Sequence, residues 1–361
     1  MRYVWLFALC LTSTFLNAQR ATLKTPEYPD HVDLSYYLDN QGVRKLIDSK
    51  NEWITRRKHV MAGMQQVMGP FPKHASPVAL EMQVHEEVRT EKYIRQLISY
   101  HTDSEVRRVR AYLFFPMPVR NTRPAVLCLH QTTGIGKKEP AGMGGNPQLH
   151  YALHLAERGF VTLAPDYPSF GDYPYTFPSE DGYVSGTMKA IYENTRAVDL
   201  LQTLRQVDSE RIGCIGHSLG GHNTIFTAAF DTRIKAMVSN CGFTRFHKYY
   251  EGKLKGWTSA RYMPLINDKY DNDPDRVPFD FPEIIASFAP RPFLASAPIH
   301  DGNFEITGVK ETMLQAAKIY RLYDADANLQ VNYPTAAHSF PEAAREVAYR
   351  FLEKHLELIK P

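Results

Sequence analysis

The 361-residue sequence has little cysteine: four residues, of which Cys10 lies in an apolar N-terminal stretch. The other three, Cys128, Cys214 and Cys241, each stand in a short apolar segment typical of a buried strand. A disulfide framework would place cysteines in loops at regular spacing instead. We therefore expect three buried free thiols that act as small apolar side chains, and no disulfide that defines the fold.

The sequence also lacks a strong excess of charge of one sign. Its formal net charge is +3, which gives no electrostatic reason to expect a nucleic-acid partner. After the N-terminal stretch no segment approaches the ~20 apolar residues of a membrane span. Residues 1–18 carry one positive charge, an apolar run and small residues at the end, which is typical of a secretory signal peptide cleaved after Ala18. We expect export to the periplasm or the extracellular space, with no membrane span in the mature chain.

Motifs for metals and phosphates are lacking too. His150 and His154 have helical spacing, but the residues between them, Tyr-Ala-Leu, omit the glutamate of a zinc hydrolase. The acidic segment 271–275 lacks the glycine and terminal glutamate of a calcium loop. Lys137 is followed by a lysine and not by the Ser or Thr of a phosphate-binding loop. We expect no metal and no cofactor.

The chain divides into an N-terminal arm and one large domain. Residues 19–80 are polar with apolar positions at helical spacing, which predicts a helical arm. Residues 81–361 begin with period-two segments that predict antiparallel strands, and from Pro124 apolar strands alternate with amphipathic helices. This alternation predicts a parallel sheet with helices on both faces. The long irregular segment 243–292 is rich in Tyr, Trp, Asp and Pro, and we interpret it as a lid-like insertion.

One strand runs directly into Gly216-His217-Ser218-Leu219-Gly220. This is the G-x-S-x-G pattern of a nucleophile elbow, in which small residues allow a sharp strand-to-helix turn that exposes the serine. The bare pattern occurs by chance, but its place between a predicted strand and a predicted helix makes it specific. We predict that Ser218 is a catalytic nucleophile.

A serine hydroxyl needs a base, and the base needs an acid to orient it. In elbow folds the chain order is Ser, acid, His, each just after a later strand. Asp301 follows the apolar segment 292–299, and His338 follows the segment 329–334. We predict Asp301 as the acid and His338 as the base, with Glu305 as the alternative acid.

An acyl-transfer reaction also needs donors for an oxyanion. The backbone N–H of Leu219, directly after the nucleophile, is the first candidate. The second belongs to the loop after the strand that ends near Leu129, where we expect the amide of Thr132 or, failing that, of Gln131.

With the elbow, the acid and the histidine loop in place, the chain resembles the α/β-hydrolase superfamily over roughly residues 80–361. The motifs are GHSLGG, LHQTTGIG, FVTLAPDYPSFG, HDGNFE and AAHSFP. The closest likeness is to the dienelactone hydrolase, acetyl xylan esterase and prolyl-oligopeptidase-type branches, and to secreted bacterial esterases. The resemblance implies a mostly parallel eight-stranded sheet with helices on both faces, and a serine triad. Dienelactone hydrolases proper use a cysteine where Ser218 stands, so that lactone chemistry is not implied.

Export and clustered aromatic residues favour an ester on a polysaccharide, acetyl or methyl, as the substrate. Aromatic rings offer apolar faces and, in Tyr and Trp, a polar group, which suits sugar rings. The residues predicted to contact substrate are Phe170, Tyr173, Trp257, Arg261 and Tyr262, with Tyr175, Tyr249, Tyr250 and Arg245 nearby in sequence.

Two other functions stay open. A serine peptidase of the prolyl-oligopeptidase type shares the elbow, but such enzymes resemble this chain less, because residues 19–80 are too short for an N-terminal propeller and show no blade repeat. An inactive hydrolase fold that only binds a partner is the third reading, and the intact order of Ser, Asp and His disfavours it.

Overall fold

The computed structural model describes residues 25–72, 77–119 and 122–358. The predicted signal peptide, residues 1–18, lies outside these ranges. Over the described ranges, none of the helices combines the length and the apolar character needed to cross a bilayer. The three cysteines of the large domain are buried and free, as predicted.

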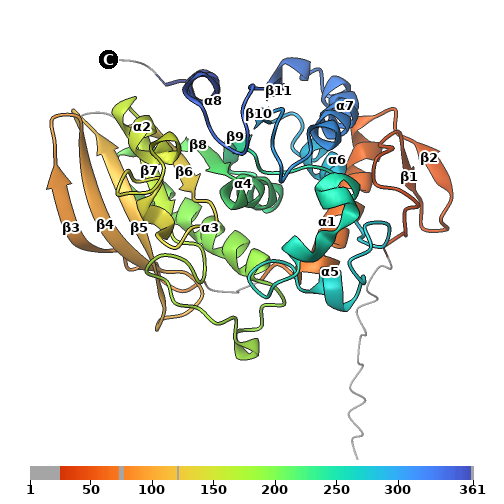
Figure 1. Cartoon of the computed structure of the whole chain (residues 1–361), viewed down its shortest axis with the longest axis horizontal. Helices are drawn as coiled ribbons and strands as arrows, with labels where there is room; N and C mark the ends of the chain where they lie inside the picture. The colour runs from red at the N-terminus through yellow and green to blue at the C-terminus, as the bar shows by residue number, and fades with distance from the viewer. Residues whose placement is uncertain (1–24, 73–76, 120–121, 359–361) are drawn as a thin grey trace, which may run out of the picture.

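A nine-stranded sheet forms the centre of the molecule, in the order β11-β10-β9-β8-β6-β7-β5-β4-β3 (Figure 1). The strands β6 to β11 pair in parallel, and β3, β4 and β5 extend the sheet as antiparallel neighbours beyond β7. The sheet has one strand more than expected, because all three N-terminal strands join it. The strands are β3 (Gln83–Arg89), β4 (Tyr93–His101), β5 (Arg108–Pro116), β6 (Arg123–Leu129), β7 (Val161–Pro165), β8 (Val207–His217), β9 (Ile234–Asn240), β10 (Phe293–Ser296) and β11 (Leu329–Asn332).

Helices cover both faces of this sheet, as predicted. Apolar side chains of α2 (Tyr151–Glu157) and α8 (Glu342–His355) share one buried cluster with the central strands. Those of α3 (Gly186–Thr203), α4 (Leu219–Phe230) and α7 (Ile306–Leu322) belong to the larger cluster on the opposite face. Figure 1 shows the two groups of helices on either side of the sheet.

The arm lies at the end of the molecule away from β3 (Figure 1). Its helix α1 (Lys50–Met68) has Ser49 as its N-cap. The Ser49 hydroxyl accepts a hydrogen bond from the N–H of Glu52, and the Glu52 carboxylate accepts one from the N–H of Ser49, so the two residues form a capping box. Two short antiparallel strands, β1 (Tyr36–Leu38) and β2 (Arg44–Leu46), precede it and were not anticipated.

The segment 243–292 contains short 3₁₀ turns together with α5 (Leu265–Asp268) and α6 (Phe281–Ala286). Contacts join α1 to both α5 and α6, so that the arm packs against this insertion.

Candidate active site

Ser218 stands between the last residue of β8 and the first residue of α4. Its backbone has φ 53° and ψ −116°. Residues other than glycine rarely adopt this conformation, which is strained. A Cβ added to Gly216 would collide with the carbonyl of Gly220, and one added to Gly220 would collide with the carbonyl of Leu129. Only glycine fits at both positions, so the sequence G-x-S-x-G is what permits this turn.

Asp301 and His338 meet through a hydrogen bond beyond the carboxyl ends of β10 and β11. The Nδ1 atom of His338 lies 3.0 Å from each carboxylate oxygen of Asp301. The side chain of Asp301 is 1% exposed and that of His338 is 23% exposed. Asp301 also accepts bonds from the N–H groups of Asn303 and Phe304, at 2.8 and 3.2 Å.

These contacts stabilise the ionised form of the Asp301 carboxyl group. Burial alone would raise the pKa of this carboxyl, but the hydrogen bond and the charge of His338 outweigh it and lower the pKa below its ordinary value. An ionised Asp301 that engages Nδ1 leaves Nε2 of the ring as the basic nitrogen. The alternative acid, Glu305, instead accepts the N–H groups of Thr307 and Gly308 at the start of α7.

Ser218 and His338 line one cavity of about 310 Å³, together with the three predicted oxyanion residues Gln131, Thr132 and Leu219. The structure thus gathers the predicted site at one edge of the sheet, with Asp301 behind the histidine. The rest of the lining is aromatic or small and polar: His222, Tyr249, Tyr250, Gly256, Trp257, Tyr262, Asn303 and Phe304.

The predicted oxyanion donors lie on two sides of Ser218. Leu219 is the first residue of α4, and such N–H groups have no acceptor within their own helix. On the other side, the Gln131 amide group donates to Glu139 at 2.9 Å, and the hydroxyls of Thr132 and Tyr262 lie 3.0 Å apart. These hydrogen bonds hold the side chains of Gln131 and Thr132 in place beside the cavity.

A buried ion pair anchors the loop that follows β6. The Lys137 ammonium, whose side chain is fully buried, contacts Asp166 at 2.7 Å and Asp172 at 2.6 Å. The N–H of Lys137 also donates to Asp166. Asp166 directly follows β7, so this pair ties the candidate oxyanion loop to the neighbouring strand.

Of the five predicted substrate residues, Trp257 and Tyr262 line the cavity, and the other three do not. Phe170 is buried under the guanidinium of Arg261, which lies 4.4 Å from its ring centre and donates to Ser169. Tyr173 is buried, and its hydroxyl donates to Glu193 at 2.5 Å. Arg245 pairs with Glu311.

Phe304, Asn303 and His222 line the cavity although the sequence reasoning did not assign them to it. The ring of Phe304 stacks on His338 with centroids 6.0 Å apart, and His222 lies 4.7 Å from Trp257. Burial lowers the pKa of His222 to about 3, so the ring is neutral at ordinary pH. Phe304 was detectable, because it falls three residues after the predicted acid.

His217 and Asn240 lie behind His338. The ring of His217 is 4.8 Å from that of His338. The amide of Asn240 donates to His217 Nδ1 at 2.6 Å and to the carbonyl of Ser339 at 3.1 Å. Burial and the nearby His338 lower the pKa of His217 to about 3, so His217 is a neutral neighbour of His338.

Cys241, Asp301 and His338 also bring three possible metal-ligand atoms within 4.8 Å of one another. A cysteine binds metal as the thiolate. Burial, together with Asp301, raises the pKa of the Cys241 thiol well above its ordinary value. The donor set therefore does not fit a metal, and its geometry fits an Asp-His pair next to a protonated thiol.

A mostly parallel sheet with helices on both faces, and a strained serine between a strand and a helix, define the fold of the chain as that of an α/β-hydrolase. The chain belongs to the prolyl oligopeptidase family, whose model matches residues 148–358. A model described as Abhydrolase family matches residues 44–176.

Individual relatives agree with this fold. The YtaP protein of Bacillus subtilis (strain 168) is 28% identical over 313 residues, which cover 83% of this chain and 99% of the relative. A glucuronoyl esterase from Solibacter usitatus superposes with a TM-score of 0.67 at 17% identity, covering 92% of this chain and 99% of the other. An acetyl xylan esterase from Paenibacillus sp. R4 gives a TM-score of 0.54 at 17% identity, covering 86% and 96%.

Proposed function

We propose that this chain is an exported serine hydrolase that cleaves carboxylic esters on polysaccharides through an acyl-enzyme. The observation that carries the proposal is the cavity that Ser218 and His338 share, with Asp301 on the far nitrogen of the histidine. The two similar structures named above, a glucuronoyl esterase and an acetyl xylan esterase, support the choice of ester.

In the proposed reaction, His338 Nε2 takes the proton of Ser218 as the hydroxyl oxygen attacks the ester carbonyl. The buried Asp301 carboxylate stabilises the imidazolium that forms. The N–H of Leu219 and an N–H of the 131–132 loop bind the oxyanion. His338 then gives its proton to the leaving alcohol, and water, activated by the same imidazole, releases the acid and restores Ser218.

The lining of the cavity favours a neutral ester. Among its described lining residues there is no lysine and no arginine, and Arg245 and Arg261 are engaged elsewhere. A polyuronate carries free carboxylates beside its methyl esters, and no guanidinium or ammonium lines this cavity to pair with them. Acetyl esters on neutral sugars are therefore the proposed substrates, with Trp257 and Tyr262 as surfaces for the sugar.

Substrate profiling tests the proposal. Acetylated xylan and 4-nitrophenyl acetate should release acetate, whereas methyl-esterified polygalacturonate should release little methanol. The Ser218→Ala variant should lose turnover while its far-UV circular dichroism is unchanged. Full activity in that variant would contradict the assignment of Ser218.

Membership of the prolyl oligopeptidase family favours a peptidase as the second candidate. The same preparation should therefore be given proline-containing peptide amides. A clear preference for these amides over aryl acetates would reverse the order of the two proposals.

A further inference from the structure

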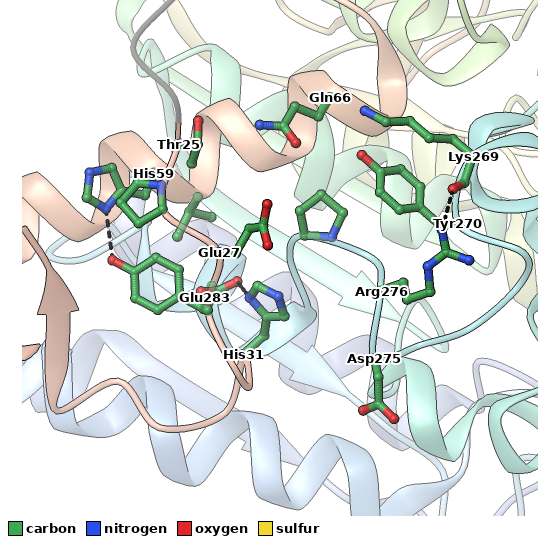
Figure 2. Close-up of a pocket in the computed structure, with 14 residues that line it drawn as sticks. Thr25, Glu27, His31, His59, Gln66, Lys269, Tyr270, Asp275, Arg276 and Glu283 are labelled. Atoms are coloured by element: carbon green, nitrogen blue, oxygen red, sulfur yellow. Dashed lines mark hydrogen bonds and ion pairs between the residues drawn. The ribbon is translucent and has the colours of Figure 1, made fainter. Parts of the chain in front are cut away.

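A second cavity, of about 580 Å³, lies between the arm and the insertion (Figure 2). None of its lining residues lines the cavity of Ser218. Its volume lies in the range of pockets that hold small ligands. The described lining comprises Thr25, Pro26, Glu27, Tyr28, His31, His59, Val60, Gln66, Lys269, Tyr270, Asp275, Arg276, Pro278 and Glu283.

One side of this cavity is a buried, hydrogen-bonded charge cluster. Glu283 accepts bonds from Arg56 and, at 2.9 Å, from His31 Nδ1. Burial alone would lower the pKa of the His31 imidazole. The charge of Glu283 and the hydrogen bond to it have the larger effect together, so the pKa is raised. Figure 2 shows the other ring nitrogen of His31 facing the cavity. Within the described ranges that nitrogen has no hydrogen-bond partner, so the cluster holds one imidazole nitrogen in place for a ligand.

His59 presents a second imidazole on the same side. The Tyr28 hydroxyl accepts the N–H of Leu38 at 3.0 Å and lies 2.8 Å from His59 Nδ1. This contact holds the His59 ring in place at the wall of the cavity. Burial lowers the pKa of His59, whereas Glu283 raises the pKa of His31, so the two imidazoles of this wall differ in their tendency to carry charge.

The other walls carry polar groups, both donors and acceptors, that make no hydrogen bond or ion pair among the described residues, and the Lys269 ammonium lies 5.0 Å from the centre of the Tyr270 ring. Over the part of the chain that the structure describes, no hydrogen bond or ion pair engages the carboxylate of Glu27, the amide of Gln66 or the ammonium of Lys269. Figure 2 shows Glu27 and Gln66 directed toward the interior. The Tyr270 hydroxyl is buried and unpartnered as well.

This composition selects a ligand by its hydrogen bonding. Carboxylates and cations both face the space, so a simple anion or cation would meet a repelling charge as well as an attracting one. A hydroxyl group can donate one hydrogen bond and accept another at the same time. Neighbouring hydroxyl groups can therefore bond to carboxylate, amide and imidazole groups that lie side by side. The rings of Tyr28 and Tyr270 also line the cavity and add apolar surface. The Arg56 guanidinium lies over the Tyr28 ring at 3.3 Å and the Lys269 ammonium over the Tyr270 ring at 5.0 Å, so the apolar surface offered to a sugar is the part of each ring that these cations leave open. These are the requirements of a neutral sugar ring.

From this geometry we infer that the arm and the insertion form a second saccharide-binding site, which holds neutral sugar units of a glycan apart from the units processed at Ser218. The inference rests on the proposed glycan esterase function. The site would raise the affinity for a polymer by adding a second contact, without changing the reaction of a small ester.

The experiment uses the full chain with Ser218→Ala, so that no ester is consumed, and xylohexaose as the ligand in isothermal titration calorimetry. The double variant Gln66→Ala/Lys269→Ala removes two exposed side chains of the cavity. Lys255→Ala, an exposed residue of the insertion outside both cavities, is the matched control. The double variant should weaken binding roughly tenfold, as expected for two lost hydrogen bonds, and the control should bind as the parent.

With Ser218 restored, the double variant should raise the KM for acetylated xylan and leave kcat/KM for 4-nitrophenyl acetate unchanged. Equal xylohexaose affinity in the double variant and the control overturns the second site, as does a parent chain that does not bind. Failure of the proposed esterase function would give a different result, because the wild-type chain would then not turn over 4-nitrophenyl acetate.

Discussion

The aspartate and the glutamate of the segment 301–305 have different roles in the structure. Asp301 contacts His338, whereas Glu305 accepts backbone N–H groups at the start of α7. Asp301→Asn should lower kcat on 4-nitrophenyl acetate by about 10⁴, because the amide cannot stabilise an imidazolium and favours the wrong tautomer. Glu305→Gln should change kcat little and cost at most about 1 kcal/mol of stability. Equal losses of kcat in the two variants would refute the assignment.

We expect Asn240 to act as a positioning residue for the same histidine. Its amide joins His217 to the carbonyl of Ser339, next to His338. Asn240→Ala should leave buried acceptors unpaired, at about 1–3 kcal/mol of unfolding free energy, and should release the loop. We expect kcat to fall more than tenfold with KM nearly unchanged, as measured by steady-state kinetics beside urea unfolding. An unchanged kcat in a destabilised but folded variant would show that Asn240 supports only the fold.

Single residues also show the limit of sequence reasoning. Ser218, Asp301 and His338 could be predicted because their chain order and their places after strands are constrained by the topology. Phe170 and Tyr173 could not be placed, because their partners, Arg261 and Glu193, come from distant segments. Aromatic composition indicates burial or a binding surface equally well, and only packing separates the two.

Among the elements, the loop after β6 depends on one buried lysine. Breaking a buried pair by removing one partner costs about 3–5 kcal/mol, so Lys137→Met should lower the unfolding free energy by that amount, because it leaves Asp166 buried and unpaired. Lys138→Met is the matched control: its ammonium is half-exposed and 3.6 Å from Asp172, where a pair contributes about 0–1 kcal/mol. Urea titration measures both. Similar small losses in the two variants would contradict an anchoring role.

The docking of the arm should depend on pH through His31. Its pKa is raised in the folded chain by Glu283, although burial opposes this. A raised pKa adds stability that is fully present below the unfolded value of about 6.5 and is lost as pH rises through the folded value. The His31→Gln variant should therefore be destabilised more at pH 6 than at pH 9, as measured by urea unfolding at both. The same loss at both pH values would show that His31 is not charged.

Periodicity predicted α2, α3, α4, α7 and α8, because these helices alternate with strands of the sheet. The short helices α5 and α6 lie in the segment 243–292, where no such alternation exists. The two short strands of the arm carried no such signal: β2 is exposed throughout, and both are three residues long. The expected count of eight strands came from the family resemblance, whereas the period-two pattern of the sequence indicated the antiparallel strands before Pro124. The strand β3 is largely exposed and joins the sheet through its pairing with β4.

In the fold as a whole, the sheet sets the place of the proposed reaction. The insertion lines the cavity that a substrate would enter. Parallel strands bring three loops that are distant in sequence to one edge, where a nucleophile, a base and an acid can meet. The insertion contributes Trp257, Tyr249 and Tyr262 to the cavity at that edge. Other residues of the insertion contact the arm and line the second cavity with it (Figure 2). Fold class could be predicted from the sequence, whereas the two cavities could not.

The most direct test of the central claim is covalent labelling of the serine. The wild-type chain, incubated with an aryl phosphonate, should gain one adduct on the peptide that contains Ser218, as read by mass spectrometry. His338→Ala should form the same adduct at least a hundredfold more slowly, in line with the 10²–10⁴-fold effect of a general base, and Ser218→Ala should form none. An adduct at another residue, or equal labelling rates with and without the imidazole of His338, would contradict the account.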